Sequence, residues 1–136
     1  MAKNMVLSNL QIEKLHKGLR ALDGVPVGSE TVRFEFSDNL SWNITKNLVL
    51  VERALEVYKK HQAKLMRDTG ISIGEKVTDS NIQKVSVWKE KLDTLNENTQ
   101  EISGLLLLKR ADLQKAGVSK FPGIMANLFD LIEPQP

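Results

Sequence analysis

Residues 37–67 read SDNLSWNITKNLVLVERALEVYKKHQAKLMR, and this stretch decides the fold class. Its apolar residues recur at steps of three and four, which places them on one face of an α-helix. That face contains Leu40, Ile44, Leu48, Val51, Leu55, Tyr58 and Leu65. Ser37 is a suitable N-cap, and Gly70 follows the basic last turn as a stop. The pattern predicts one helix of about 45 Å, longer than a compact domain of this size needs.

A second helix is predicted downstream of the first. Ser80-Asn81-Ile82-Gln83 has the form of a capping box at a helix start. The apolar stripe that follows contains Val85, Trp88, Leu92, Leu95 and Ile102. The simplest packing of the two helices is an antiparallel hairpin. Trp42 and Trp88 are then expected as anchors in the core or at its rim.

Shorter elements flank this hairpin. A capping box at Ser8 to Gln11 predicts a first helix that ends near Gly24. Alternating residues predict a strand over Thr31 to Phe36, and the apolar run Leu105 to Leu108 is expected to pair with it. Two short helices are predicted beyond, at Ala111 to Ala116 and after Pro122.

Together these elements predict an α+β fold that is predominantly α. It consists of a long antiparallel helical hairpin, a short two-stranded ribbon and flanking short helices. The 136 residues suffice for one core, so a single domain over 1–136 is expected.

The composition excludes several classes of function. There are 19 Lys and Arg against 17 Asp and Glu, a balance that does not by itself indicate nucleic-acid binding. The absence of cysteine excludes disulfides, thiolate metal ligands and cysteine nucleophiles. The first residues lack the apolar region of a signal peptide, and no run approaches the ~18 apolar residues of a membrane span. A soluble intracellular protein without membrane contact is expected.

No catalytic or metal-binding motif in the sequence meets the structural requirements of its chemistry. Gly70-Ile71-Ser72-Ile73-Gly74 matches the G-x-S-x-G string, but no histidine follows Ser72 to serve as base. His16 and His61 fall on different predicted helices without a metal-ligand spacing. Nucleotide-binding glycine motifs are also missing. We therefore expect a non-enzyme with no cofactor, no catalytic residue and no metal ligand.

One basic cluster is a candidate contact for an anion or a partner. It consists of Lys59, Lys60, Lys64 and Arg67, at the end of the long helix. The alternative is a solvated helix end whose charges complement the macrodipole. Tyr58 is the only aromatic residue beside the cluster, so nucleic acid or a nucleotide is weakly supported as a partner.

The layout resembles a family of small, mostly helical proteins of unassigned function that tailed bacteriophages and prophages encode. The segments that carry the likeness are 7–12, 34–37, 43–48, the strand ending at Lys109, 111–113 and 124–133. They are patterns of apolar and cap residues, so the resemblance transfers no functional residue. It implies a phage source, an accessory role, and a place in the cytoplasm of the bacterial host or in the virion.

Two functions follow as expectations. The first is a non-catalytic interaction protein, accessory to virion assembly or structure, that self-associates through the excess length of its long helix. The alternative is an antagonist or sponge of a bacterial anti-phage defence system that binds a host protein or a small nucleotide.

Overall fold

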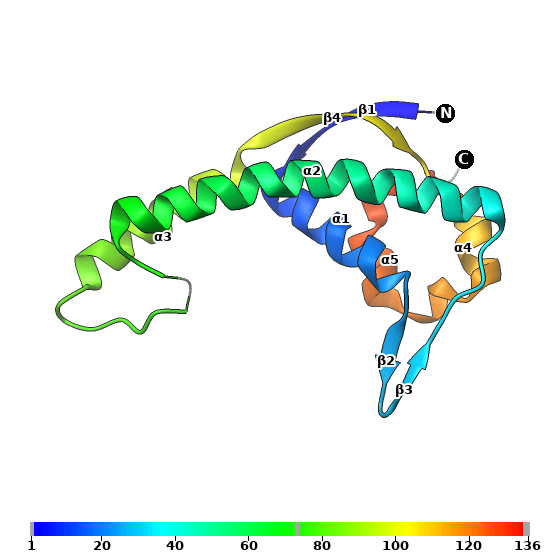
Figure 1. Cartoon of the computed structure of the whole chain (residues 1–136), viewed down its shortest axis with the longest axis horizontal. Helices are drawn as coiled ribbons and strands as arrows, with labels where there is room; N and C mark the ends of the chain where they lie inside the picture. The colour runs from blue at the N-terminus through cyan, green and yellow to red at the C-terminus, as the bar shows by residue number, and fades with distance from the viewer. Residues whose placement is uncertain (1, 73, 135–136) are drawn as a thin grey trace.

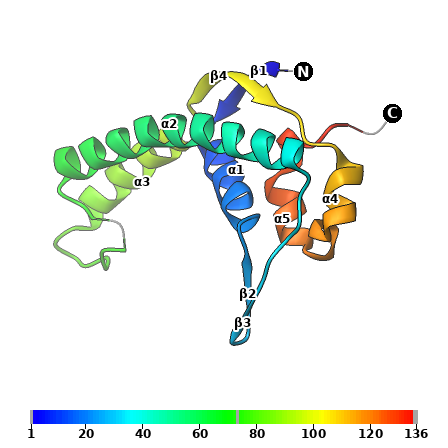
Figure 2. The ribbon, with the colours of Figure 1, turned by 45° about the vertical axis from the view of Figure 1, so that its right-hand side comes forward.

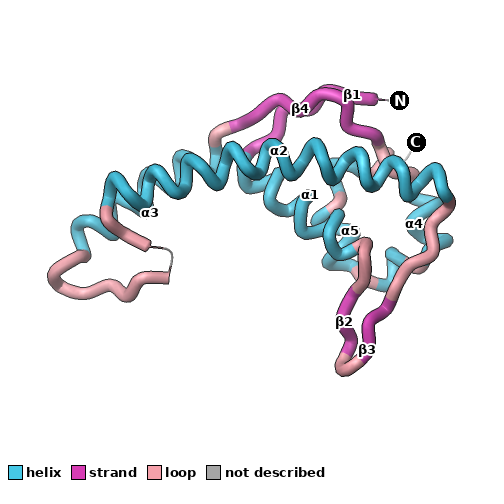
Figure 3. The backbone as a smooth tube through the Cα atoms, in the orientation of Figure 1, coloured by secondary structure: helices cyan, strands magenta, loops and turns pink. Residues whose placement is uncertain are grey.

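The computed structural model describes residues 2–72 and 74–134 of the chain (Figure 1). The elements are, in order, β1 (Ala2–Ser8), α1 (Asn9–Ala21), β2 (Val25–Val27), β3 (Glu30–Val32), α2 (Asp38–Thr69), α3 (Ile82–Glu97), β4 (Thr99–Leu106), α4 (Arg110–Ala116), η1 (Val118–Lys120), α5 (Pro122–Asn127) and η2 (Phe129–Leu131). The described part is α+β and mainly α, which confirms the predicted class (Figure 3).

Helix α2 is the axis of the molecule. It has 32 residues, the Ser37 Oγ accepts a hydrogen bond from the Leu40 N–H at 3.2 Å, and Gly70 ends the helix at φ +71°. A positive φ is the conformation that glycine adopts without strain at a helix end. Helix α3 runs back beside α2, which confirms the helical hairpin, and α1, α4 and α5 lie across α2 from the ribbon of β1 and β4 (Figures 1 and 2).

The strand partners differ from those predicted. Strand β4 pairs antiparallel with β1 at the beginning of the chain, and Ser8 lies opposite Thr99. The expected pairing of residues 105–108 with residues 32–36 is wrong. Strand β3 pairs with β2 in a second ribbon, while Phe34 and Phe36 leave the strand and Phe34 packs edge-on against Phe121. Short alternating runs do not encode their partner. Strand β1, which contains the buried Leu7, is not among the elements predicted from the sequence.

The bounds of α3 also differ. The Ser80 capping box does not form, because Asn81 is the N-cap and its amide donates to Glu75 Oε2 and to the Lys76 carbonyl. The helix ends at Glu97, and Ile102 is a buried residue of β4. Gly104 lies within β4 at φ +88°, where the pairing register shifts by one residue.

The core forms where α1 crosses α2. The predicted Ser8 capping box is present, and Ile12, Leu15 and Leu19 of α1 are buried against α2, β4 and the C-terminal helices. Trp42 is 63% exposed, so its expected role as an anchor is wrong, whereas Trp88 is half-buried on α3. On α2 the core ends at Tyr58, so the last eleven residues of that helix lie beyond it.

Candidate functional site

The last part of α2, the following loop and α3 form an arm that projects from the core. We define the arm as residues 59–97; it extends to the left in Figure 1. Within it, Leu95 is the one α3 residue that packs against the core cluster. The arm is therefore the excess length that the sequence predicted for α2, together with its antiparallel neighbour.

Polar groups fasten the arm to the body at its base. The buried Asn9 donates through Nδ2 to the Leu95 carbonyl at 2.7 Å. Gln100 Nε2 donates to Asn9 Oδ1 at 2.7 Å and to the Ala54 carbonyl at 3.0 Å. Beside this network, the Tyr58 hydroxyl donates to Asn96 Oδ1. These bonds join the starts of α1 and β4 to α2 and α3, so the arm leaves the body in a defined direction.

Beyond its base the arm has little core of its own. Helix α3 contains no buried residue among its 16. The side chains between the two helices are half-buried, namely Leu65, Met66, Val85, Trp88 and Leu92. On the outside of α3, Ile82 and Val87 are 55% and 46% exposed. A helix that buries so little of its apolar side is typical of an element that packs against another surface.

The predicted basic cluster lies on this arm. Lys59, Lys60, Lys64 and Arg67 are all exposed. The Lys60 Nζ lies 3.6 Å from Glu56 Oε1, one turn earlier in α2. Lys60, Lys64 and Arg67 share one helix face by their spacing, whereas Lys59 lines a hollow with His16 and Glu52 of the body. The structure therefore divides the cluster between the base of the arm and its outer part.

The candidate residues for chemistry are not brought together. Ser72 is exposed in the loop after α2, and both histidines precede it on α1 and α2. His16 Nε2 lies 3.6 Å from Glu52 Oε1, and Arg20 Nη2 lies 2.7 Å from the same oxygen, so this group joins α1 to α2. Across residues 2–72 and 74–134, no group of three or more potential metal-ligating side chains occurs. The same residues include no helix with the length and apolarity to cross a membrane.

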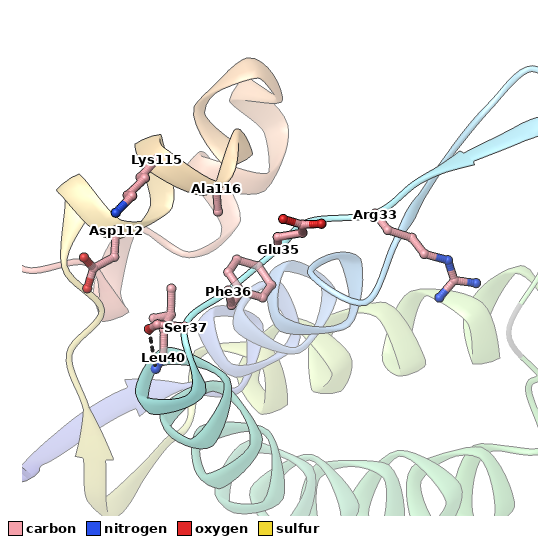
Figure 4. Close-up of a pocket in the computed structure, with 8 residues that line it drawn as sticks. All are labelled: Arg33, Glu35, Phe36, Ser37, Leu40, Asp112, Lys115 and Ala116. Atoms are coloured by element: carbon pink, nitrogen blue, oxygen red, sulfur yellow. Dashed lines mark hydrogen bonds between the residues drawn. The ribbon is translucent and has the colours of Figure 1, made fainter.

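A hollow of about 650 Å³ opens at the start of α2 (Figure 4). Arg33 and Lys115 line it together with Glu35 and Asp112, so its cations and carboxylates balance. Figure 4 shows Arg33 at the far end from Lys115, so the two cations do not converge on one point. This arrangement does not favour a phosphate ligand.

A groove of about 780 Å³ lies between α1, β2 and α5. Its apolar lining includes Val25, Pro26, Phe121, Pro122 and Ile124. His16, Lys17, Arg20 and Lys120 line the groove as well, and no carboxylate does. No sequence motif indicates this groove, since its residues come from two distant stretches of the chain, 16–26 and 120–127.

The fold and the arm define a small α+β protein with a projecting helical hairpin. Comparisons with protein-family models, with curated proteins and with solved structures found no match.

Proposed function

We propose that this protein is a non-catalytic interaction protein that self-associates through its arm. The observation that carries the proposal is α3, a 16-residue helix without one buried side chain. Isolated helices of about this length are marginal in water, and helices in proteins are stabilised mainly by burial of an apolar face. A second copy of the arm supplies the missing surface.

The proposal fits the remaining features of the site. The arm is fastened at its base by buried hydrogen bonds, which is the support that an interaction surface needs to keep its orientation. In the phage setting that the sequence resemblance implies, such a protein would be accessory to virion assembly or structure.

Light scattering coupled to size-exclusion chromatography tests self-association. We expect a particle mass above the 15.3 kDa of one chain, rising with concentration. The substitutions Ile82→Ser and Val87→Ser change exposed residues of the arm. They should lower the particle mass toward that of the monomer, since both remove apolar surface. The matched control is Val6→Ser with Val27→Ser, two exposed valines outside the arm. A wild-type chain that stays monomeric at high concentration overturns the proposal.

A second candidate function is favoured by the groove beside α1. An apolar lining with basic groups and no carboxylate is suited to a small nucleotide, whose base would contact Phe121 while its phosphate meets Lys120. This would correspond to a sponge that acts against a bacterial defence system.

Thermal-shift screening with cyclic nucleotides and nucleoside phosphates tests this second candidate. A ligand at 100 times its dissociation constant adds about 2.7 kcal/mol to the free energy of unfolding. We expect the shift to be lost in Lys120→Glu and kept in Lys115→Glu, which changes a lysine of the other hollow. No shift with any of these compounds contradicts nucleotide binding.

A further inference from the structure

The charges of α3 are segregated along its length. Residues 82–91 contain three lysines and one glutamate, whereas residues 92–97, the rest of the helix, contain Asp93 and Glu97 and no basic residue. Tyr58 meets Asn96 at the base of the arm, and residues 70–72 and 74–81 lie at its far end (Figure 1). The outer part of α3 is therefore basic, and the part next to the body is acidic.

Helix α2 does not show this segregation within the arm. Lys59 and Lys60 lie next to the body, and Lys64, Arg67 and Asp68 lie in its outer turns. The segregation of charge is therefore a property of α3. Because opposite charges attract over short distances in water and like charges repel, this distribution favours one relative direction of two arms.

The macrodipole accounts for the charges of α2 but not for those of α3. Cations stabilise the C-terminal end of a helix, as Arg67 does in α2. Helix α3 has no acidic residue in its first turn, which contains Lys84, and no basic residue in its last turn, which contains Glu97. Each such charge opposes the macrodipole and has a free-energy cost in an exposed helix. An external surface of opposite charge would offset this cost.

The basic and acidic groups also share a face. Ile82, Lys89, Asp93 and Glu97 follow one another at steps of seven and four, so they lie along one side of α3. All four side chains are exposed. From the outer end toward the body, this side presents an apolar residue, a cation at the middle of the helix and two carboxylates.

We propose that two copies of this chain pair with their arms antiparallel, related by a two-fold axis. This inference rests on the proposed self-association and specifies its geometry. The outer part of one arm, with Arg67 and Lys89, lies against Asp93 and Glu97 of the other arm. Two-fold symmetry forms each contact twice, and the half-buried apolar residues between α2 and α3 are covered at the centre. Parallel arms would place like charges against each other.

Two charge-reversed variants test this geometry. The first carries Arg67→Glu and Lys89→Glu, so both ends of its arm are acidic. The second carries Asp93→Lys and Glu97→Lys, so both ends are basic. We expect each variant alone to dimerise at least about tenfold more weakly than the wild type at low salt, and their equimolar mixture to form a 1:1 heterodimer. Native mass spectrometry resolves the heterodimer by mass, and the chain with all four substitutions should regain homodimerisation.

The controls separate this inference from the proposed function. Lys3→Glu with Lys14→Glu makes the same change in net charge outside the arm and should leave dimerisation unchanged. Circular dichroism verifies that each variant is folded. If a double variant is not folded, the mixing test is repeated with two single variants, Lys89→Glu and Asp93→Lys. Wild-type dimers that persist in both variants, without preference for the heterodimer, overturn the antiparallel geometry alone. A monomeric wild type overturns self-association as well.

Discussion

Asn47 is a polar side chain at the centre of the core, and its amide forms the hydrogen bonds that the backbone of a neighbouring strand would otherwise form. It is fully buried on α2, its Nδ2 donates to the Leu106 carbonyl at 2.7 Å, and its Oδ1 accepts from the Leu106 N–H at 2.8 Å. The amide thereby pairs with both backbone groups of one residue at the end of β4. A buried polar group is tolerated because every bond it needs is made.

Replacing Asn47 should therefore cost more than the removed atoms suggest. In Asn47→Leu the N–H and carbonyl of Leu106 lose their partner, and each unsatisfied group costs about 1–3 kcal/mol. We expect the free energy of unfolding to fall by about 2–5 kcal/mol in chemical denaturation. The matched control is Asn43→Leu, a half-buried asparagine of the same helix for which no hydrogen bond is seen in the described residues. Equal stability of the two variants would contradict this role.

The pKa of the Tyr58 hydroxyl depends on its burial and on its neighbours. Burial raises the pKa of its hydroxyl above the usual 10.0, and the nearby Glu13 carboxylate raises it further, while a hydrogen bond with Gln62 acts in the opposite direction. Because the folded state retains the proton, the stability contributed by Tyr58 is complete below pH 10 and is lost as the pH rises through the raised value. Tyr58 is the single tyrosine of the chain, so tyrosinate absorbance reports on it alone.

We expect that absorbance to titrate at higher pH in the folded protein than in urea. Tyr58→Phe should remove the signal and lower the free energy of unfolding by about 0.5–1.5 kcal/mol through loss of the bond to Asn96. Superimposable titrations in the folded and unfolded states would show that Tyr58 is not shielded as described.

At the scale of elements, α1 and α5 approach closely at one glycine. Gly18 is buried on α1, and a Cβ placed on it would lie 2.8 Å from Leu128 Cδ2 and 3.1 Å from Asn127 Cβ. Leu128 is itself fully buried, so its side chain has no room to move away. The missing side chain at position 18 thus sets the distance between the N-terminal helix and the C-terminal segment.

Gly18→Ala should destabilise the protein although alanine is the better helix former. The gain in helix propensity is about 1 kcal/mol, whereas overpacking typically costs about 1–3 kcal/mol. We expect a net loss of about 1–2 kcal/mol by thermal or chemical denaturation. In the Leu128→Ala background the same change should cost less or become stabilising, since the clashing atoms are gone. Additive effects of the two substitutions would speak against a contact between them.

At the scale of the whole molecule, stability is distributed unevenly. The body contains the buried cluster, while in the arm beyond Tyr58 and Leu95, Ile71 is the one buried apolar residue described and the contacts between the two helices are half-buried. Segments with few buried contacts open locally at low free energy. The chain therefore combines a firmly packed body with an arm that has few buried contacts.

Hydrogen exchange should show this difference directly. We expect amides of α3 to exchange quickly at low protein concentration and more slowly as the concentration rises, because association buries the arm. Amides of α1, which lies in the core, should exchange at a rate independent of concentration. Concentration-independent exchange throughout α3 would count against an interface on the arm.

Local signals in the sequence were enough to place the helices. These signals involve residues within a few positions of one another. They are the serine cap and the glycine end of α2, the capping box of α1 and the apolar periodicity of both helices. The same signals predicted the mainly helical class and the position of the basic cluster. The helix end near residue 102 was misplaced, because an apolar residue at helical spacing is also compatible with a strand.

Contacts between distant segments decided the rest. The pairing of Ser8 with Thr99 and the bond between Asn47 and Leu106 join residues that no local pattern relates. The groove beside α1 and the division of the basic cluster likewise depend on how stretches that are distant in sequence meet. Sequence alone therefore determined which residues form helices, because capping and periodicity act over a few residues. Tertiary packing decided the strand partners, the projection of the arm and the charge that the arm presents, because burial depends on what lies across the core.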